Sequence, residues 1–150
     1  MIKSKSIRRA ALAAIVAVAF GAPAFAAGDA RTHGHEAGEA KLLLNQGKKW
    51  QTDAPLRQGM ENIRAALGGG MKYAALAKKV NAEVAGIVQN CKLEPEADAQ
   101  LHLVIAELMA GAEAMEGKVK GETRRAGAEK VANALNAYGE HFDHAGWKRL

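Results

Sequence analysis

The sequence has 150 residues, of which 49% are hydrophobic, 25% charged and 5% aromatic. This content is enough for one folded domain with an apolar core, which excludes full disorder. The 16 glycines have no period of three and there is one cysteine, which excludes collagen-like and disulfide-framework proteins. Three prolines and frequent Ala, Leu, Lys and Glu favour helix over sheet.

Residues 1–26 have the layout of a secretory signal peptide. Four basic residues precede an apolar run over residues 10–20, and the small side chains of Ala24 and Ala26 suit a cleavage site. The run is too short to span a bilayer comfortably, so a retained membrane anchor is the less favoured alternative. We therefore expect cleavage after Ala26, a periplasmic location and no membrane association after cleavage.

The positive charge lies largely in this segment. The whole chain has 21 Lys and Arg against 16 Asp and Glu, a formal net charge of +5. Four of the basic residues and none of the acidic ones lie in residues 1–26, so residues 27–150 carry only about +1. A nucleic-acid partner is therefore not expected.

Residues 27–52 are expected to precede the folded bundle. The stretch 27–40 is small, polar and rich in glycine, which indicates a flexible arm. The stretch 41–52 has three Leu and Trp50 around Asn45 and Gly47, which is too interrupted to predict a helix firmly. An extended strap laid against the domain is the other interpretation.

The first two helices follow this stretch. Thr52 or Asp53 suits the cap of a helix with Pro55 in its first turn, and three consecutive glycines at 68–70 end it. A second helix is expected over residues 71–91, where apolar residues recur at helical spacing. Its stripe consists of Tyr73, Leu76, Val80, Val84, Ile87 and Cys91.

Two further helices are expected over residues 96–116 and 118–143. Pro95 and the acidic residues after it suit the start of the third helix, and Gly117 ends it. The fourth has an apolar stripe that ends at Tyr138 and Phe142. The four helices predict an all-α fold, an antiparallel up-down-up-down four-helix bundle over residues 53–150.

The many alanines and the glycines inside these helices are expected to allow close packing, and the glycines are also expected to weaken the bundle. Gly86, Gly121 and Gly127 are each expected to cost about 1 kcal/mol relative to Ala.

Two segments resemble the cytochrome b562 family. RQGMENIRAAL at 57–67 aligns Met60 with an axial haem ligand of that family, and residues 116–142 resemble its last helix. In the family a His follows Asn-Ala-Tyr as the second ligand, and here Gly139 stands at that position. The resemblance implies a four-helix fold and, as an alternative function, b-type haem electron transfer with Met60 and His141 as ligands.

Histidines near both ends of the chain suggest a transition-metal site. Two lie on the arm as His-Gly-His, and two lie at i and i+3 near the end of the fourth helix with acidic neighbours. Nitrogen and oxygen donors of this kind suit copper or zinc. The candidate ligands are His33, His35, Glu140, His141, Asp143 and His144.

Each of these features also has a plain structural interpretation. Histidines at a helix carboxyl end are stabilised by the macrodipole without any metal. His102 is expected in the core or at its boundary, and Met60, Met109 and Met115 are expected to fill the core.

Cys91 is the one thiol in the sequence. It is expected to be a small buried core residue, with a metal-bound thiolate or an intermolecular disulfide as alternatives.

The sequence contains no nucleophile elbow, phosphate-binding glycine loop or inward Glu-x-x-His set, so an enzyme is not expected. The leading hypothesis is a non-catalytic periplasmic four-helix-bundle binding protein that handles a transition metal through its terminal histidines. The alternatives are a b-type haem carrier and a protein-interaction adaptor.

Overall fold

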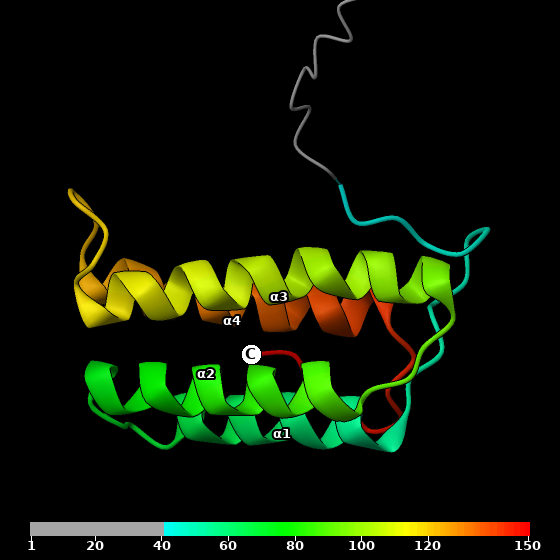
Figure 1. Ribbon diagram of the computed structural model, residues 1–150, viewed down its shortest axis with the longest axis horizontal. Coiled ribbons are helices and arrows are strands. Elements are labelled where there is room, and N and C mark those ends of the chain that lie inside the picture. The colour runs from blue at the N-terminus through cyan, green and yellow to red at the C-terminus, as the bar shows by residue number, and fades with distance from the viewer. Residues whose placement is uncertain (1–40) are drawn as a thin grey trace, which may run out of the picture. The chain divides into compact units, whose positions relative to one another are not determined.

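The computed structural model describes residues 41–150, which form four helices (Figure 1). The expected signal peptide, the arm and its His33 and His35 lie outside the described residues. No strand occurs within 41–150, where only two isolated β-bridges are present. The all-α prediction with four helices is confirmed. The helices are α1 (Ala54–Gly68), α2 (Tyr73–Asn90), α3 (Pro95–Glu116) and α4 (Arg124–His141).

The core is built from the apolar stripes of all four helices. Each helix packs on the next one along the chain, and α1 also meets α4. Fully burying one Leu, Ile or Met side chain contributes about 1.5–3 kcal/mol, so the combined stripes drive folding. The largest side chains that are fully buried include Leu56, Met60, Ile63, Leu108, Met115, Leu135, Tyr138 and Phe142.

Three predictions of burial were wrong. Met109, which was expected to fill the core, is 45% exposed, and Tyr73, the first residue of the predicted stripe of the second helix, is 39% exposed. The side chain of His102 is 61% exposed, so this residue lies on the surface of α3 and not in the core. A stripe inferred from periodicity, such as the one that contains Tyr73, can be wider than the face that the neighbouring helices cover.

The predicted start of the first helix is confirmed. Asp53 is its N-cap, and its carboxylate accepts a hydrogen bond of 2.9 Å from the Leu56 amide. Pro55 lies in the first turn, where its missing N–H costs nothing. At the other end of the bundle, Gly117 ends α3 with φ +79°, a left-handed conformation that glycine adopts freely.

The fourth helix is shorter than the sequence predicted, and its carboxyl end matters for the site. It begins at Arg124, because the Thr123 hydroxyl accepts from the Ala126 amide and caps it there. It ends at His141, because Phe142 turns to an extended conformation and is buried in the core. The residues after Phe142 therefore do not continue the helical spacing.

Helices α3 and α4 meet backbone to backbone at a pair of glycines. A Cβ atom on Gly111 would lie 2.7 Å from the Gly127 carbonyl oxygen, and one on Gly127 would lie 2.6 Å from that of Gly111. The expected close packing is confirmed at Gly127, whereas the expected cost relative to Ala does not apply there, because a Cβ atom does not fit. Gly121 precedes α4 at φ +84°, so the expectation for a helix interior does not apply to it. A Cβ atom on Gly86 would meet nothing within 4 Å, which agrees with the expected gain from Ala at that position.

Residues 41–53 form a segment without helix, here called the strap, which is fastened to the end of α4. The Trp50 amide donates to the His141 carbonyl at 2.8 Å, and the Asp143 amide donates to the Trp50 carbonyl at 2.7 Å. The Thr52 hydroxyl adds a bond of 2.6 Å to the Asp143 carbonyl. A tight turn at Gln46 and Gly47, both with positive φ, reverses the strap.

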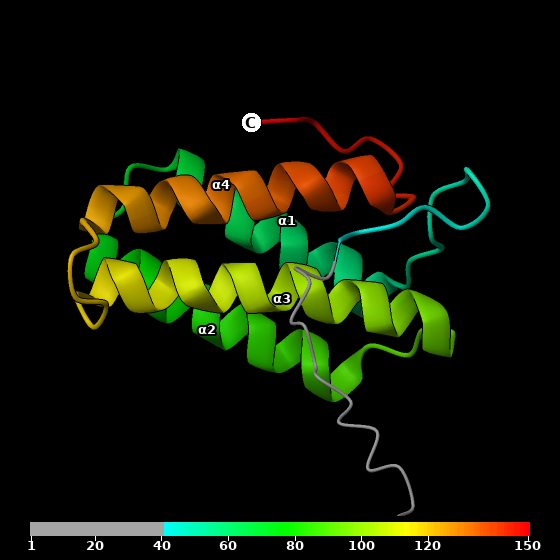
Figure 2. The ribbon, with the colours of Figure 1, turned by 90° about the horizontal axis from the view of Figure 1, so that it is seen from above.

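The chain after α4 folds back along that helix, as Figure 2 shows for the segment that ends at the C-terminus. The Leu150 amide donates to the side-chain oxygen of Asn136 in α4 at 2.9 Å. Among the described helices, none is both long enough and apolar enough to cross a membrane.

Candidate functional site

The predicted metal ligands at the end of α4 point in different directions. Glu140 is exposed and pairs with Arg149 at 3.2 Å. His141 is half-buried, and its Nδ1 lies 2.8 Å from the carbonyl oxygen of Ala137 one turn earlier. Asp143 is exposed, and its main chain holds the strap. These three side chains therefore do not converge on one point.

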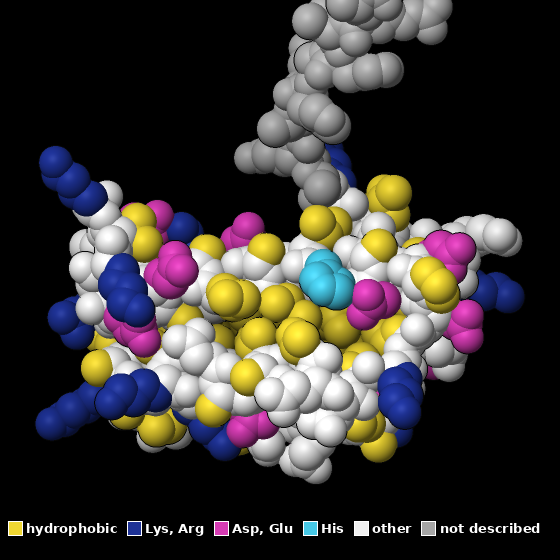
Figure 3. All heavy atoms as spheres, viewed as in Figure 1, with side chains coloured by type: hydrophobic (Ala, Val, Ile, Leu, Met, Phe, Trp, Pro, Cys, Tyr) yellow, Lys and Arg dark blue, Asp and Glu magenta, His cyan; other side chains and the backbone are white. Residues whose placement is uncertain are grey.

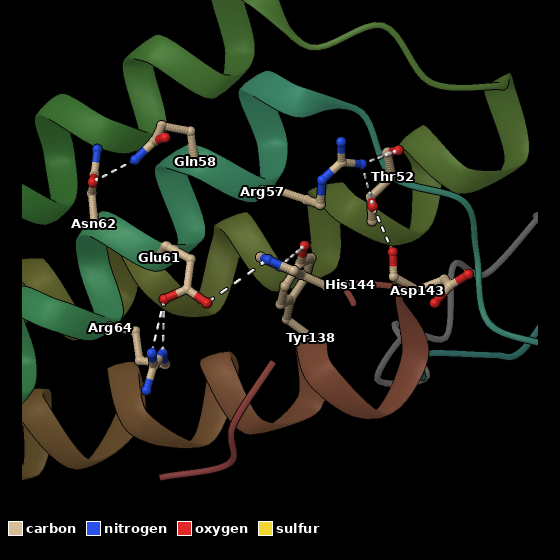
Figure 4. A network of polar contacts seen from close by, with 9 residues as sticks. All are labelled: Thr52, Arg57, Gln58, Glu61, Asn62, Arg64, Tyr138, Asp143 and His144. Atoms are coloured by element: carbon tan, nitrogen blue, oxygen red, sulfur yellow. Dashed lines mark hydrogen bonds and ion pairs between the residues drawn. The ribbon is translucent and has the colours of Figure 1, made fainter. Parts of the chain in front are cut away.

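His144 turns into the molecule. Its side chain is 7% exposed, and its Nδ1 lies 2.9 Å from the hydroxyl of Tyr138 (Figure 4). Its Nε2 faces Glu61 of α1 at 3.8 Å, which is longer than a hydrogen bond. Burial lowers the pKa of His144; Glu61 opposes this shift, and Arg57 and Arg64 reinforce it. The histidine is therefore neutral near pH 7 and serves as a packed polar residue between two helices.

His141 and His144 do not form the predicted i, i+3 pair, because α4 stops at His141. Two histidines at i and i+3 share a face only while the helix continues, and here Phe142 is extended. Within residues 41–150, no group of three or more His, Cys, Asp or Glu side chains is placed to hold a metal ion. The other two predicted ligands, His33 and His35, lie outside the described residues.

A polar network joins α1 to the strap and to the chain after α4 (Figure 4). The Arg57 guanidinium donates to the Thr52 carbonyl at 2.7 Å, which fixes the strap to the first turn of α1. Arg64 makes two hydrogen bonds to Glu61, of 2.9 and 3.1 Å. The same Arg64 lies over the ring of Trp147 at 5.5 Å, a cation–π contact.

Trp147 covers the position where the cytochrome b562 resemblance places a haem ligand. A Cβ atom on Gly139 would lie 2.3 Å from the indole of Trp147. The indole also packs edge-on against Tyr138, with ring centroids 4.9 Å apart. Met60 is fully buried among core residues. The residues present therefore do not fit a haem group held by Met60 and His141.

The strap covers a pocket at the end of the bundle where α1 and α3 begin, here called the strap pocket. Its volume is about 500 Å³, and its walls are the strap on one side and the connection from α2 to α3 on the other. The pocket is lined by Asn45, Gln46, Trp50, Gln51, Thr52, Asp53, Lys92, Leu93, Glu94, Glu96 and Ala97.

Asp53 fixes the relative positions of the two walls. Besides capping α1, its carboxylate accepts from the Lys92 amide at 2.6 Å and from the Cys91 thiol. Burial tends to raise the pKa of Asp53, but the hydrogen bonds from Lys92, Leu56 and Cys91 lower it below 3.8. The carboxylate is therefore ionised at neutral pH, and both of its oxygens accept hydrogen bonds from the protein.

Cys91 is half-buried and forms no disulfide. Burial raises the pKa of its thiol to about 12, and the nearby charges of Asp53 and Asp98 act in the same direction. The thiol is therefore protonated at neutral pH and donates a hydrogen bond to Asp53.

The chemistry of the strap pocket is that of a small polar ligand site. Three carboxylates and one ammonium line it, so its net charge is negative. Three side-chain amides supply both donors and acceptors, and Trp50 supplies an aromatic ring. The Trp50 Nε1 donates to the Leu43 carbonyl at 2.6 Å, which holds the indole in place.

Comparison with family models, with curated proteins and with solved structures finds no match to this chain.

Sequence reasoning missed the strap pocket and the role of Trp147. The pocket joins residues 45–53 to residues 92–97, and no local pattern signals that pairing. For Trp147 a signal existed, since a glycine at 139 inside an otherwise apolar stripe leaves room for a large side chain from elsewhere.

Proposed function

We propose that this protein is a non-catalytic binding protein that takes up a small organic amine in the strap pocket. The observation that carries the proposal is a pocket of about 500 Å³ whose lining combines an aromatic ring, amides and an excess of carboxylates. Pockets of this size and mixed lining are typical of small-ligand sites.

An amine is the ligand class that matches this lining. Glu94 and Glu96 are exposed at the amino end of α3 and add negative charge to the rim, with only Lys92 to offset it. A cationic ligand is favoured by these charges and by the face of Trp50. An anionic ligand meets three carboxylates and is disfavoured.

Titration calorimetry with a panel of small ligands tests this proposal. An alkyl diamine and a quaternary ammonium compound are expected to bind, and a neutral sugar and a dicarboxylate are not. The variant Glu94→Gln/Glu96→Gln is expected to weaken amine binding by roughly tenfold, the effect of losing two charges near a partly screened site. The control Glu107→Gln/Glu129→Gln removes two exposed carboxylates elsewhere on the surface and is expected to bind as the wild type does. Absence of amine binding at millimolar concentration contradicts the proposal.

A second candidate function, transition-metal binding, is supported by the geometry of His141. Since its Nδ1 lies 2.8 Å from a carbonyl, that nitrogen carries the hydrogen and Nε2 keeps its lone pair for a metal. We propose His33, His35 and His141 as the ligand set for copper or zinc. The variant His33→Ala/His35→Ala/His141→Ala is expected to lose tight Cu(II) binding, whereas His102→Ala keeps it. Equal affinity of both variants contradicts this candidate.

We further propose that the four helices run antiparallel in the order up-down-up-down. Each connection between consecutive helices is four to seven residues long, which favours antiparallel neighbours.

A relationship to the cytochrome b562 family and an exported, periplasmic location remain part of the proposal. They rest on the resembling segments and on the signal-like residues 1–26.

A further inference from the structure

Tyr138 and His144 form a buried pair that the proposed function does not use. Tyr138 is fully buried, and its hydroxyl lies 2.9 Å from Nδ1 of His144, whose side chain is 7% exposed (Figure 4). Since Nε2 of His144 faces the Glu61 carboxylate, the imidazole hydrogen is expected on Nε2, and Nδ1 is left to accept from the phenol. Neither residue of the pair lines the strap pocket.

The partner of the Tyr138 phenol is a base, which is unusual for a buried hydroxyl. Most side-chain hydrogen bonds go to backbone groups or water, and a backbone carbonyl cannot take up a proton. A neutral imidazole can, and the Glu61 carboxylate on its other side stabilises the imidazolium that forms. Burial raises the pKa of Tyr138, so the phenol keeps its proton at rest. A phenol that loses an electron becomes strongly acidic, and at that moment the imidazole is in place to take the proton.

Trp147 connects this pair to the surface. Its ring is half-buried and lies edge-on to Tyr138, with centroids 4.9 Å apart, and its centroid is 5.0 Å from that of His144. Apolar side chains reach the surface elsewhere too, as the face of α2 and α3 shows (Figure 3), so exposure alone does not distinguish Trp147. Its contact with a buried phenol and imidazole does.

The surroundings of Trp147 favour the transfer of an electron without a proton. Its Nε1 is buried and has no hydrogen-bond partner within residues 41–150, so an oxidised indole keeps its proton. The Arg64 guanidinium lies 5.5 Å from the ring centroid and disfavours a positive charge on the ring. An oxidised indole at this position is therefore expected to draw an electron from Tyr138, its nearest phenol.

We propose that Trp147, Tyr138 and His144 form a one-electron relay through which the protein reduces a small oxidising radical at its surface. The radical takes one electron from the Trp147 indole, which becomes a radical cation. Tyr138 returns one electron to the indole while its phenolic proton moves to Nδ1 of His144. The products are the reduced oxidant, a neutral indole, a neutral tyrosyl radical and an imidazolium.

The relay is reset by a one-electron reductant. The tyrosyl radical takes one electron from the reductant and recovers its proton from the imidazolium of His144, so that no proton leaves the pair over the cycle. This activity goes beyond the proposed function and does not depend on it, because it needs neither the strap pocket nor a bound ligand.

Pulse radiolysis of the purified protein, with the azide radical as the oxidant, tests the relay. The chain has two Trp and two Tyr, and Trp50 and Tyr73 belong to none of the aromatic ring pairs within residues 41–150, so they supply matched controls. In the wild type an indole radical is expected to decay as a tyrosyl radical forms, at a rate independent of protein concentration. Tyr138→Phe and Trp147→Phe are each expected to lose this step, whereas Tyr73→Phe and Trp50→Phe keep it.

A further variant separates proton transfer from packing. His144→Gln keeps a hydrogen-bonding side chain beside the phenol but cannot take up its proton, and it is expected to slow tyrosyl formation by about 10²-fold, the contribution of a positioned base. The wild-type step is expected to be slower in heavy water than in ordinary water. Circular dichroism verifies that each variant keeps its helices.

Three results overturn the proposal. A tyrosyl signal that survives Tyr138→Phe places the radical elsewhere, and equal rates in His144→Gln and wild type remove the imidazole from the step. A wild-type rate that is the same in heavy and ordinary water excludes coupled proton transfer, and this measurement needs no variant.

Discussion

Asp53 connects two segments that are separate in the sequence. One carboxylate caps α1, accepts a hydrogen bond from the Lys92 amide in the connection from α2 to α3, and accepts another from the Cys91 thiol. The sequence predicted the cap, because an acidic residue two positions before a proline at a helix start is a strong local signal. It did not predict the other two bonds, because nothing local to residues 91–92 indicates a partner 39 residues away.

The variant Asp53→Asn is expected to destabilise the protein by about 1–2 kcal/mol, because its amide group cannot accept from both walls of the strap pocket. Urea unfolding at neutral pH measures the change. Asp143→Asn serves as the control: it alters an exposed side chain and is expected to stay within about 0.5 kcal/mol of the wild type. A loss of the same size in both variants contradicts the role given to Asp53.

The lowered pKa of Asp53 also predicts how the free energy of unfolding depends on pH. Since the pKa of Asp53 is below 3.8 in the folded protein, its carboxylate stabilises the fold fully above its unfolded pKa. That stabilisation is lost as the pH falls from about 4 through the lower folded pKa. The difference in unfolding free energy between wild type and Asp53→Asn is therefore expected to shrink in this range, and a constant difference down to about pH 2 contradicts the account.

Gly139 and Trp147 are expected to be energetically coupled. Gly139→Ala places a Cβ against the indole and is expected to cost about 1–3 kcal/mol. In a Trp147→Ala background the same change fills open space in a helix and is expected to be neutral or to stabilise by up to about 1 kcal/mol. A double-mutant cycle measures the coupling. Equal costs of Gly139→Ala in both backgrounds show that the indole does not fill that space.

At the scale of elements, the positions of the helices were predictable and their ends were only partly so. The bounds of α1 to α3 follow from local residues such as Pro55, Pro95 and Gly117, which act within one turn. The carboxyl end of α4 depends instead on Phe142 entering the core and on the strap pairing with it. This non-local cause is also the reason that the histidine cluster predicted there is not assembled.

The contact between α3 and α4 yields a prediction about glycines in helices. Gly111→Ala is expected to destabilise by several kcal/mol, because its Cβ meets the Gly127 carbonyl and Val131, which the helix holds in place. Gly86→Ala is the matched variant on α2, where nothing lies within 4 Å, and it is expected to stabilise by about 0.4–1 kcal/mol. Thermal unfolding measures both, and a stabilising Gly111→Ala contradicts the close approach.

At the scale of the whole molecule, the proposed binding site arises where elements distant in the sequence meet. The strap pocket combines residues near position 50 with residues near position 95. Periodicity indicates which side chains are apolar but not how wide a face the neighbouring helices cover. Tyr73, which periodicity placed on a core stripe, is 39% exposed.

The central claim, that the strap pocket takes up an amine, is tested most directly by nuclear magnetic resonance. ¹⁵N-labelled protein is titrated with an alkyl diamine, and amide and indole shifts are followed. The account predicts saturable shifts at the Trp50 indole and at residues 92–97, with little change in the connection between α1 and α2. Shifts that stay absent at millimolar diamine, or that spread evenly over the surface acids, contradict it.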